Sequence, residues 1–139
     1  MLIHIADADG VGYEARVRED SAASLYIELT LGGRYVGMAE CTSRSRHEWE
    51  FSHVEIERPF RRKGLATELV KLVIHRLRKR GARRLYGSVM PDALAEFPGI
   101  LEWYGGLGFT RGEAYPVCIA GAAAYIHLDL QRVGWVQRN

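Results

Sequence analysis

Cysteine and proline are both scarce in this chain of 139 residues, which contains two cysteines, Cys41 and Cys118, and four prolines. Two cysteines cannot build the disulfide framework of a small secreted domain, so we expect a reduced, cytoplasmic protein. No repeat, low-complexity segment or linker rich in proline and serine divides the sequence. Because this length suits one domain with its own hydrophobic core, we expect residues 1–139 to form a single domain.

Long apolar runs are missing as well. No run approaches the roughly 18 residues that a membrane span needs. The N-terminal segment MLIHIADADG lacks the basic start and long apolar stretch of a signal peptide. We therefore expect no membrane partner. The five histidines show no metal-ligand spacing, so we predict no metal site.

Two common phosphate-binding motifs are also absent. The chain has no G-x-G-x-x-G fingerprint, which disfavours a dinucleotide fold. A Walker loop needs lysine after glycine and then serine or threonine. Here Lys63 precedes Gly64 and Leu65 follows it, so that motif is excluded.

The N-terminal half alternates with the period of β-strands. Segments 25–31 and 34–41 flank Gly32-Gly33, which predicts a β-hairpin. Residues 49–57 predict a further strand. Two weaker strands are expected near 2–6 and 12–18.

Residues 65–80 change to the period of a helix. Basic residues occupy the face opposite the apolar positions Leu65, Leu69, Leu72, Val73 and Leu77. Gly81 stands where a helix C-cap belongs. The elements expected after it are a strand at 83–89, a short helix around 97–106 and closing strands near 109–116 and 122–130. Strands on both sides of a central amphipathic helix predict an α/β (α+β) domain with a mixed, twisted sheet of about six to seven strands.

Positive charge is concentrated in one stretch, although the net charge is only +2. Eleven Lys/Arg residues and one acid, Glu68, lie between Arg58 and Arg84. In RPFRRKGLAT (58–67), three of these cations precede Gly64, where the predicted helix begins. The first amides of a helix are unpaired and carry partial positive charge, and glycine lets a ligand approach the backbone. This stretch is therefore either an anion site suited to phosphate or a solvated charge run.

The residues here resemble a known family. Arg61-x-x-Gly64-x-Ala66, between a strand and an amphipathic helix, resembles the Q/R-x-x-G-x-G/A acetyl-CoA pyrophosphate loop of the GCN5-related N-acetyltransferases (GNAT). LEWYGGLGF at 101–109 resembles the tyrosine-plus-GF motif of that family, and 54–64 resembles its fourth strand running into the loop. The resemblance extends over residues 34–130 in the right order.

The resemblance implies acetyl-CoA as co-substrate, without a metal, and names residues that would hold it. The backbone of Val54, Glu55 and Ile56 would pair with the pantetheine arm. The residues implied at the pyrophosphate are Arg61, Arg62, Lys63, Gly64, Leu65, Ala66 and Thr67. Tyr104 would stand near the sulfur and protonate the departing thiolate.

Acyl transfer to a primary amine also needs a base or a water, because a protonated amine has no lone pair. The strand at 49–57 offers Glu50, His53 and Glu55. Glu50, eleven residues before Arg61, resembles the catalytic glutamate of some family members. The resemblance implies a small-molecule or peptide amine as acceptor, which the sequence does not identify. The extended N-terminal half could also pair across a homodimer.

Three departures from the family pattern stand out. Phe97 occupies a position where many members have a cofactor-binding asparagine, and Ser88 falls where some have a carboxylate. Most members begin with a strand and two helices that wall the acceptor site, whereas residues 1–57 here predict strands. The acceptor site is therefore less defined than the cofactor site.

Other interpretations stay open. The basic stretch 58–84 could belong to a small nucleic-acid-binding module, and Phe97 is compatible with a non-catalytic acyl-CoA sensor. Tyr104 could be a core tyrosine with a hydrogen-bonded hydroxyl, and Glu50 could be a plain solvent-facing residue, as could Glu55. We expect six basic residues to form a mostly solvated face, and some of them to meet the 3′-phosphate of CoA. They are Arg76, Arg78, Lys79, Arg80, Arg83 and Arg84.

Overall fold

The structure is a computed structural model and describes residues 1–115 and 118–132. Its strands are β1 (Leu2–Ala6), β2 (Gly12–Arg18), β3 (Ser24–Leu31), β4 (Arg34–Ser43), β5 (Glu48–Ile56), β6 (Arg84–Val89), β7 (Thr110–Gly112) and β8 (Ala124–Asp129). Its helices are the 3₁₀ turn η1 (Arg58–Phe60), α1 (Leu65–Lys79), α2 (Pro91–Glu96) and α3 (Ile100–Gly106).

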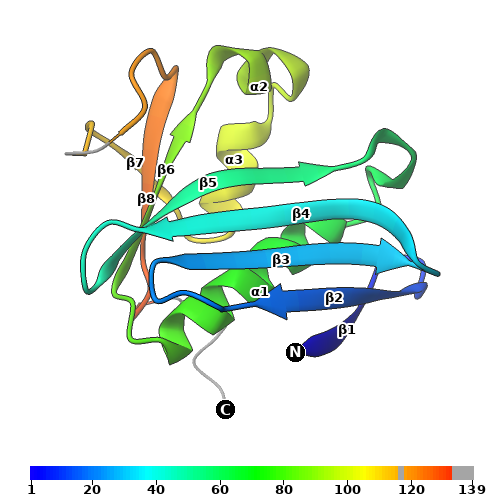
Figure 1. Ribbon diagram of the computed structural model, residues 1–139. Helices are drawn as coiled ribbons and strands as arrows, with labels where there is room; N and C mark the ends of the chain where they lie inside the picture. The colour runs from blue at the N-terminus through cyan, green and yellow to red at the C-terminus, as the bar shows by residue number, and fades with distance from the viewer. Residues whose placement is uncertain (116–117, 133–139) are drawn as a thin grey trace.

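The described strands form one mixed sheet in the order β1-β2-β3-β4-β5-β6-β8-β7 (Figure 1). Neighbours are antiparallel except β5 and β6, which run parallel and are joined by α1. The predicted mixed sheet with a central helix is confirmed, but it has eight strands rather than six to seven. Both weak N-terminal strands form, because Tyr13, Ala15 and Val17 bury one face of β2.

Two predicted elements differ in extent. The short helix expected around 97–106 is α3 alone, and α2 precedes it. Pro91 suits the first turn of α2, while Phe97, the residue before Pro98, is driven out of helical geometry at φ −129° and ψ 85°. The strand expected at 109–116 is confined to β7, and residue 116 of that prediction lies outside the described residues.

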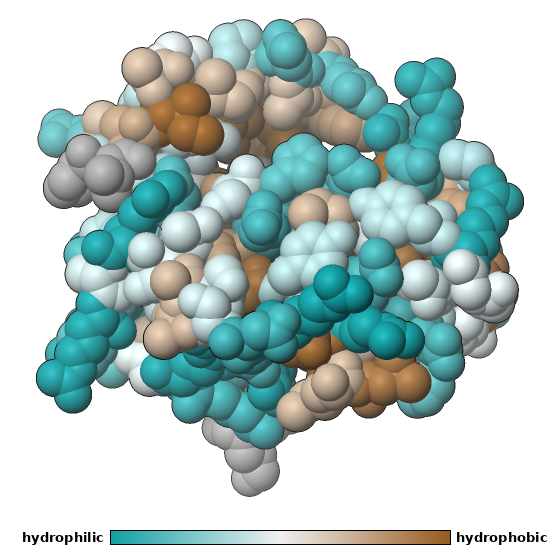
Figure 2. Space-filling view, in the orientation of Figure 1, coloured by the Kyte–Doolittle hydropathy of each residue, from teal (hydrophilic) through white to brown (hydrophobic). Residues whose placement is uncertain are grey.

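α1 packs against one face of the sheet and supplies much of the core. Its buried side chains are Leu65, Leu69, Val70, Val73, Ile74 and Leu77, while Leu72 packs partly buried beside them. On the sheet surface that faces α1, every second residue of a strand is buried, as Leu25, Ile27 and Leu29 are in β3. Figure 1 views the sheet from the opposite face, which Figure 2 shows to be mostly hydrophilic.

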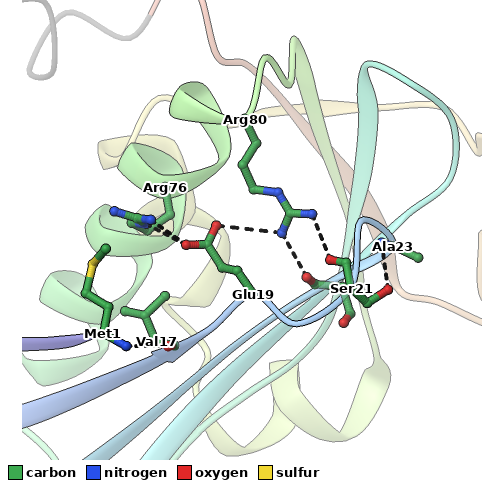
Figure 3. A network of polar contacts seen from close by, with 8 residues as sticks. Met1, Val17, Glu19, Ser21, Ala23, Arg76 and Arg80 are labelled. Carbon is green, nitrogen blue, oxygen red and sulfur yellow. Dashed lines mark hydrogen bonds and ion pairs between the residues drawn. The ribbon is translucent and has the colours of Figure 1, made fainter.

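The C-terminal end of α1 is tied to the β2–β3 turn by ion pairs (Figure 3). Glu19 pairs with both Arg76 and Arg80, whose side chains are 14% and 20% exposed. Arg80 also donates to the carbonyl oxygens of Ser24 at 2.8 Å and Ser21 at 2.9 Å. The prediction of a solvated face is therefore wrong for these two arginines, because an acid 57 residues from Arg76 folds back onto them.

β5 and β6 pair over one short stretch and then separate. The paired residues are Glu48, Trp49 and Glu50 with Arg84, Leu85 and Tyr86. β5 continues to Ile56 and β6 to Val89, and the structure pairs no described residue across these two halves. The second half of β5 thus has one edge that is not hydrogen-bonded to a neighbouring strand, and this edge leads into the 57–64 loop.

Candidate active site

The free edge of β5 exposes the backbone of alternate residues. The Glu57 amide donates to the Val36 carbonyl at 2.7 Å, and the same register places Glu55 opposite Met38. Backbone groups of successive strand residues point in opposite directions. The backbone of Glu55 therefore faces β4, and that of Val54 and Ile56 faces the free edge.

The loop that follows turns its amides outward. Arg62 has φ 62° and Gly64 has φ 79°, so two residues of the turn lie in the left-handed region. Within the described residues, none of the amides from Arg62 to Thr67 has a hydrogen-bond acceptor. Unpaired amides at a helix start, together with an open Gly64, form a concave donor surface that suits a phosphate group. The residues present thus fit the pyrophosphate that the motif implies.

The cations of the loop differ in their contacts. Arg61 donates from Nε to the Ile56 carbonyl at 2.8 Å and pairs with Glu96 at 2.6 Å. Its guanidinium also lies 5.4 Å from the ring centre of Phe97. Arg61 thus links the end of β5 to α2, whereas the Arg62 side chain is exposed. Lys63 reaches Asp9 at 4.0 Å.

Tyr104 lies on α3, on the same side of the sheet as α1. Its ring centre lies 4.7 Å from that of Trp103 in a tilted contact and 5.2 Å from that of Phe109 in an edge-on contact, and the residue is 7% exposed. Burial raises the pKa of Tyr104 to about 12. A protonated hydroxyl of this kind is able to donate a hydrogen bond to a bound atom.

Glu50 is buried rather than solvent-facing, at 2% exposure. Arg44 forms an ion pair with one carboxylate oxygen, and the Tyr115 hydroxyl donates to the other at 2.5 Å. Ser88 lies 3.0 Å from the same hydroxyl, and Tyr86 stacks on the Tyr115 ring at 4.7 Å. The solvent-facing interpretation of Glu50 is wrong, because these side chains cover it.

Sequence reasoning missed Tyr115. It stands 65 residues from Glu50 in a segment without motif or periodicity, so no local signal marks the contact. The hint to this contact is chemical, because a buried carboxylate on a strand needs hydrogen-bond donors from elsewhere in the fold.

Tyr104 and Glu50 approach β5 from opposite faces. Phe51 contacts Phe109, the neighbour of Tyr104, on the α1 side. Glu50 precedes Phe51 and points to the other face, at the last residue pair before β5 and β6 separate. A group lying between the separated strands would therefore meet Tyr104 from one side and the Glu50 network from the other.

Glu55 is held on the hydrophilic face of the sheet. It accepts hydrogen bonds from the Tyr35 hydroxyl at 2.7 Å and pairs with His53 at 2.8 Å. These bonds, that from Tyr35 first, lower the pKa of Glu55. A carboxylate held ionised in this way is a poor proton acceptor near neutral pH.

The described residues offer neither a membrane-spanning helix nor a metal-binding cluster. No helix among them is long and apolar enough to cross a membrane. Within 1–115 and 118–132, no three His, Cys, Asp or Glu side chains are grouped so that they could hold a metal ion.

Comparison with known proteins identifies the family. A model described as the acetyltransferase (GNAT) family matches residues 5–96. The chain belongs to the GNAT family. The predicted family is thereby confirmed, and the matched range includes the 61–66 loop but ends before the 101–109 motif. No curated protein matched the sequence.

Solved structures share this fold at low identity. The GNAT domain of S. lividans PAT matches with a TM-score of 0.76 and 13% identity, covering 92% of this chain and 96% of that one. A GNAT acetyltransferase from Elizabethkingia anophelis with acetyl-CoA bound gives 0.63 and 14%, covering 77% and 76%. The PaiA N-acetyltransferase from Thermoplasma acidophilum, in complex with coenzyme A, gives 0.63 and 12%, covering 77% and 61%. These likenesses establish the GNAT fold of this chain.

Proposed function

We propose that this GNAT protein is an acetyl-CoA-dependent N-acetyltransferase that acetylates a primary amine by direct attack on the thioester. One observation carries the proposal: the free edge of β5 continues into six consecutive amides, residues 62–67, that have no acceptor among the described residues. The amides of an extended pantetheine arm both donate and accept, as a strand edge requires, and the pyrophosphate that follows supplies acceptors for the unpaired amides. Two of the solved relatives hold coenzyme A or acetyl-CoA.

Val54 and Ile56 would hold the pantetheine arm through their backbone, with Glu55 between them contributing its side chain to the hydrophilic face. Amides of residues 62–67 would hold the pyrophosphate, with charge from Arg62 and Lys63. Arg61 would brace the loop through Ile56 and Glu96. Acetyl-CoA supplies the acetyl group as a thioester.

Tyr104 would act on the leaving thiolate. Its pKa of about 12 keeps the hydroxyl protonated at neutral pH. That value lies about 3.5 pKa units above the ~8.5 of a free thiol, so complete proton transfer to the thiolate is uphill. The main contribution of Tyr104 is therefore a hydrogen bond to the charge developing on sulfur.

Glu50 would receive the amine proton, either through the Tyr115 hydroxyl or through a water ordered on β5. Both of its oxygens are engaged, so direct contact with the amine requires Tyr115 to move. The Glu50 network lies on the face opposite Tyr104, which separates the proton acceptor from the leaving group. The acceptor amine would accordingly enter from the hydrophilic face shown in Figure 2.

Isothermal titration with acetyl-CoA at moderate salt tests the function. We expect micromolar affinity, about 8 kcal/mol of binding free energy, and product formation with some amine in a screen of polyamines, amino acids and peptide N-termini. Binding without turnover would support the acyl-CoA sensor instead. No binding at millimolar acetyl-CoA, with salt-sensitive binding of nucleic acid, would support the nucleic-acid module.

The Tyr104→Phe variant tests the role at sulfur. We expect kcat to fall about tenfold to a hundredfold, because one hydrogen bond to developing charge is lost while the ring packing stays. The alkaline limb of the pH–rate profile should not change, since a pKa near 12 lies beyond the assay range. Tyr26→Phe on β3 is the matched control, and equal kcat in both variants would exclude the role.

The Glu50→Gln variant tests the proton acceptor. We expect kcat to fall about a hundredfold, because a carboxamide cannot accept the amine proton. Thermal unfolding is measured alongside, because Arg44 loses its ion-pair partner in this variant. A folded variant with an unchanged kcat would assign the proton to water.

A further inference from the structure

The N-terminal hairpin contacts the 61–64 loop directly. The Ala8 amide, in the turn between β1 and β2, donates to the Lys63 carbonyl at 2.8 Å. At the other end of the loop, the Tyr13 ring packs edge-on against Phe60 of η1, with centroids 6.4 Å apart. Segments at the start of the chain thus hold both ends of the proposed pyrophosphate loop.

The contact at Lys63 fixes the direction of the next amide. A trans peptide is planar, and its carbonyl and N–H point in opposite directions. Because the Lys63 carbonyl points to Ala8, the Gly64 N–H points away from the hairpin. Gly64 is among the amides that have no acceptor within the described residues, so this peptide orientation presents it to an incoming anion.

Asp7 organises the turn that makes this contact. One of its carboxylate oxygens accepts from the amides of Asp9 at 2.9 Å and Val11 at 3.0 Å. The other accepts from the Tyr13 hydroxyl at 2.8 Å. The residue is 8% exposed, and no other acid in the turn is buried.

The Asp7 carboxylate is built to stay ionised. Burial alone raises its pKa, but its three hydrogen bonds, that from Tyr13 first, together lower it. An ionised carboxylate accepting several donors is a strong organiser of a short turn. A hollow of about 260 Å³ lies at the junction and is lined by Ala6, Asp7, Ala8, Lys63, Gly64, Thr67 and Glu68.

We infer that Asp7 is a positioning residue for coenzyme A, acting through Ala8 and the Lys63 carbonyl on the Gly64 amide. The inference rests on the proposed function. It assigns to the N-terminal hairpin, which departs from the family pattern, a role in holding the acyl donor. Asp7 itself touches no part of the ligand.

The test compares two ligands that share the thiol arm, of which only coenzyme A carries the pyrophosphate and the 3′-phosphoadenosine joined to it. Coenzyme A and pantetheine are titrated into the wild-type chain and into Asp7→Ala. We expect the variant to bind coenzyme A about tenfold more weakly, roughly the loss of one amide–phosphate hydrogen bond. Pantetheine affinity should stay within about twofold, because β5 holds that arm.

Backbone NMR gives a readout that does not depend on an acceptor amine. In the wild-type chain, coenzyme A should shift the Gly64 amide resonance strongly, and in Asp7→Ala that shift should shrink. The matched control is Asp9→Ala in the same turn, whose side chain is 74% exposed and meets Lys63 at 4.0 Å. This control should bind both ligands as the wild type does.

Milder variants cover the case in which Asp7→Ala does not fold. Asp7→Asn keeps an oxygen for the two amides and should recover most of the affinity, whereas Tyr13→Phe removes one donor and should lose about threefold. Equal coenzyme A affinity in folded Asp7→Ala, or equal losses for both ligands, overturns the positioning role alone. A wild-type chain that binds no coenzyme A overturns the proposed function and this inference together.

Discussion

The two ends of α1 are made of the same residue types but differ in their contacts. Each end has cations beside a glycine with positive φ, Gly64 at 79° and Gly81 at 83°. At the C-terminal end, the Gly81 amide donates to the Arg78 carbonyl oxygen at 3.1 Å. The Ala82 amide donates to the Leu77 carbonyl oxygen at 3.0 Å. At the N-terminal end, the corresponding donors have no acceptor among the described residues.

The cations follow the same division. Arg76 and Arg80 are held by Glu19 and by turn carbonyls (Figure 3). At the other end, Arg62 is exposed and Lys63 has one distant acidic neighbour. Charge density alone therefore does not distinguish the two ends. Donors that the fold leaves without acceptors distinguish them, and they mark the end that we propose for coenzyme A.

Replacing each glycine by alanine gives the largest expected contrast. Both glycines have φ near 80°, and an added Cβ meets no atom within 4 Å at either, so alanine costs a similar backbone strain of about 1 kcal/mol at both positions. Gly64→Ala also redirects amides of the proposed cradle and should weaken coenzyme A binding about a hundredfold. Gly81→Ala should leave it unchanged.

Isothermal titration of both variants, with urea unfolding, checks this contrast. The two proteins should lose similar stability and differ in affinity. Equal affinities would mean that the N-terminal end of α1 does not hold the ligand, and the comparison between the two ends would fail.

The converse experiment removes an internal partner at the C-terminal end. Glu19→Ala leaves Arg76 and Arg80 largely covered and without this acid, which should lower the free energy of unfolding by about 2 kcal/mol. Coenzyme A affinity should not change. Urea unfolding measures the loss.

Glu68→Ala is the stability control for Glu19→Ala. Glu68 meets Lys71 at 4.0 Å with both side chains more than 40% exposed, so its loss should cost less than about 0.5 kcal/mol. If Glu19→Ala were as stable as this control, the arginines at that end would behave as a solvated face after all.

The same contrast explains what the sequence could predict. Regular spacing marked α1 and the β3–β4 hairpin, and the motif from Arg61 to Ala66 marked the loop, because these signals are local. Glu19, which pairs with Arg76, and Tyr115, which covers Glu50, stand 57 and 65 residues away from them in the chain. Local patterns hold no information on such contacts. The sequence therefore could not tell which cations of α1 are paired, or that Glu50 is buried.

The smallest effect is expected at the link between the open end of α1 and the helix of Tyr104. The Trp103 indole donates to the Thr67 hydroxyl at 2.8 Å, beside the last amide of the proposed cradle. Trp103→Phe removes this donor and should weaken coenzyme A binding about threefold, the value of one neutral hydrogen bond. Thr67→Val, which removes the acceptor, should do the same.

A double-mutant cycle shows whether the bond itself is responsible. The combined variant should be no weaker than either single variant, because the second change removes a bond that is already lost. Fully additive losses would mean that each side chain acts through packing alone. The N-terminal end of α1 would then bind its ligand independently of α3, and Tyr104 would depend on the sheet rather than on this link for its position.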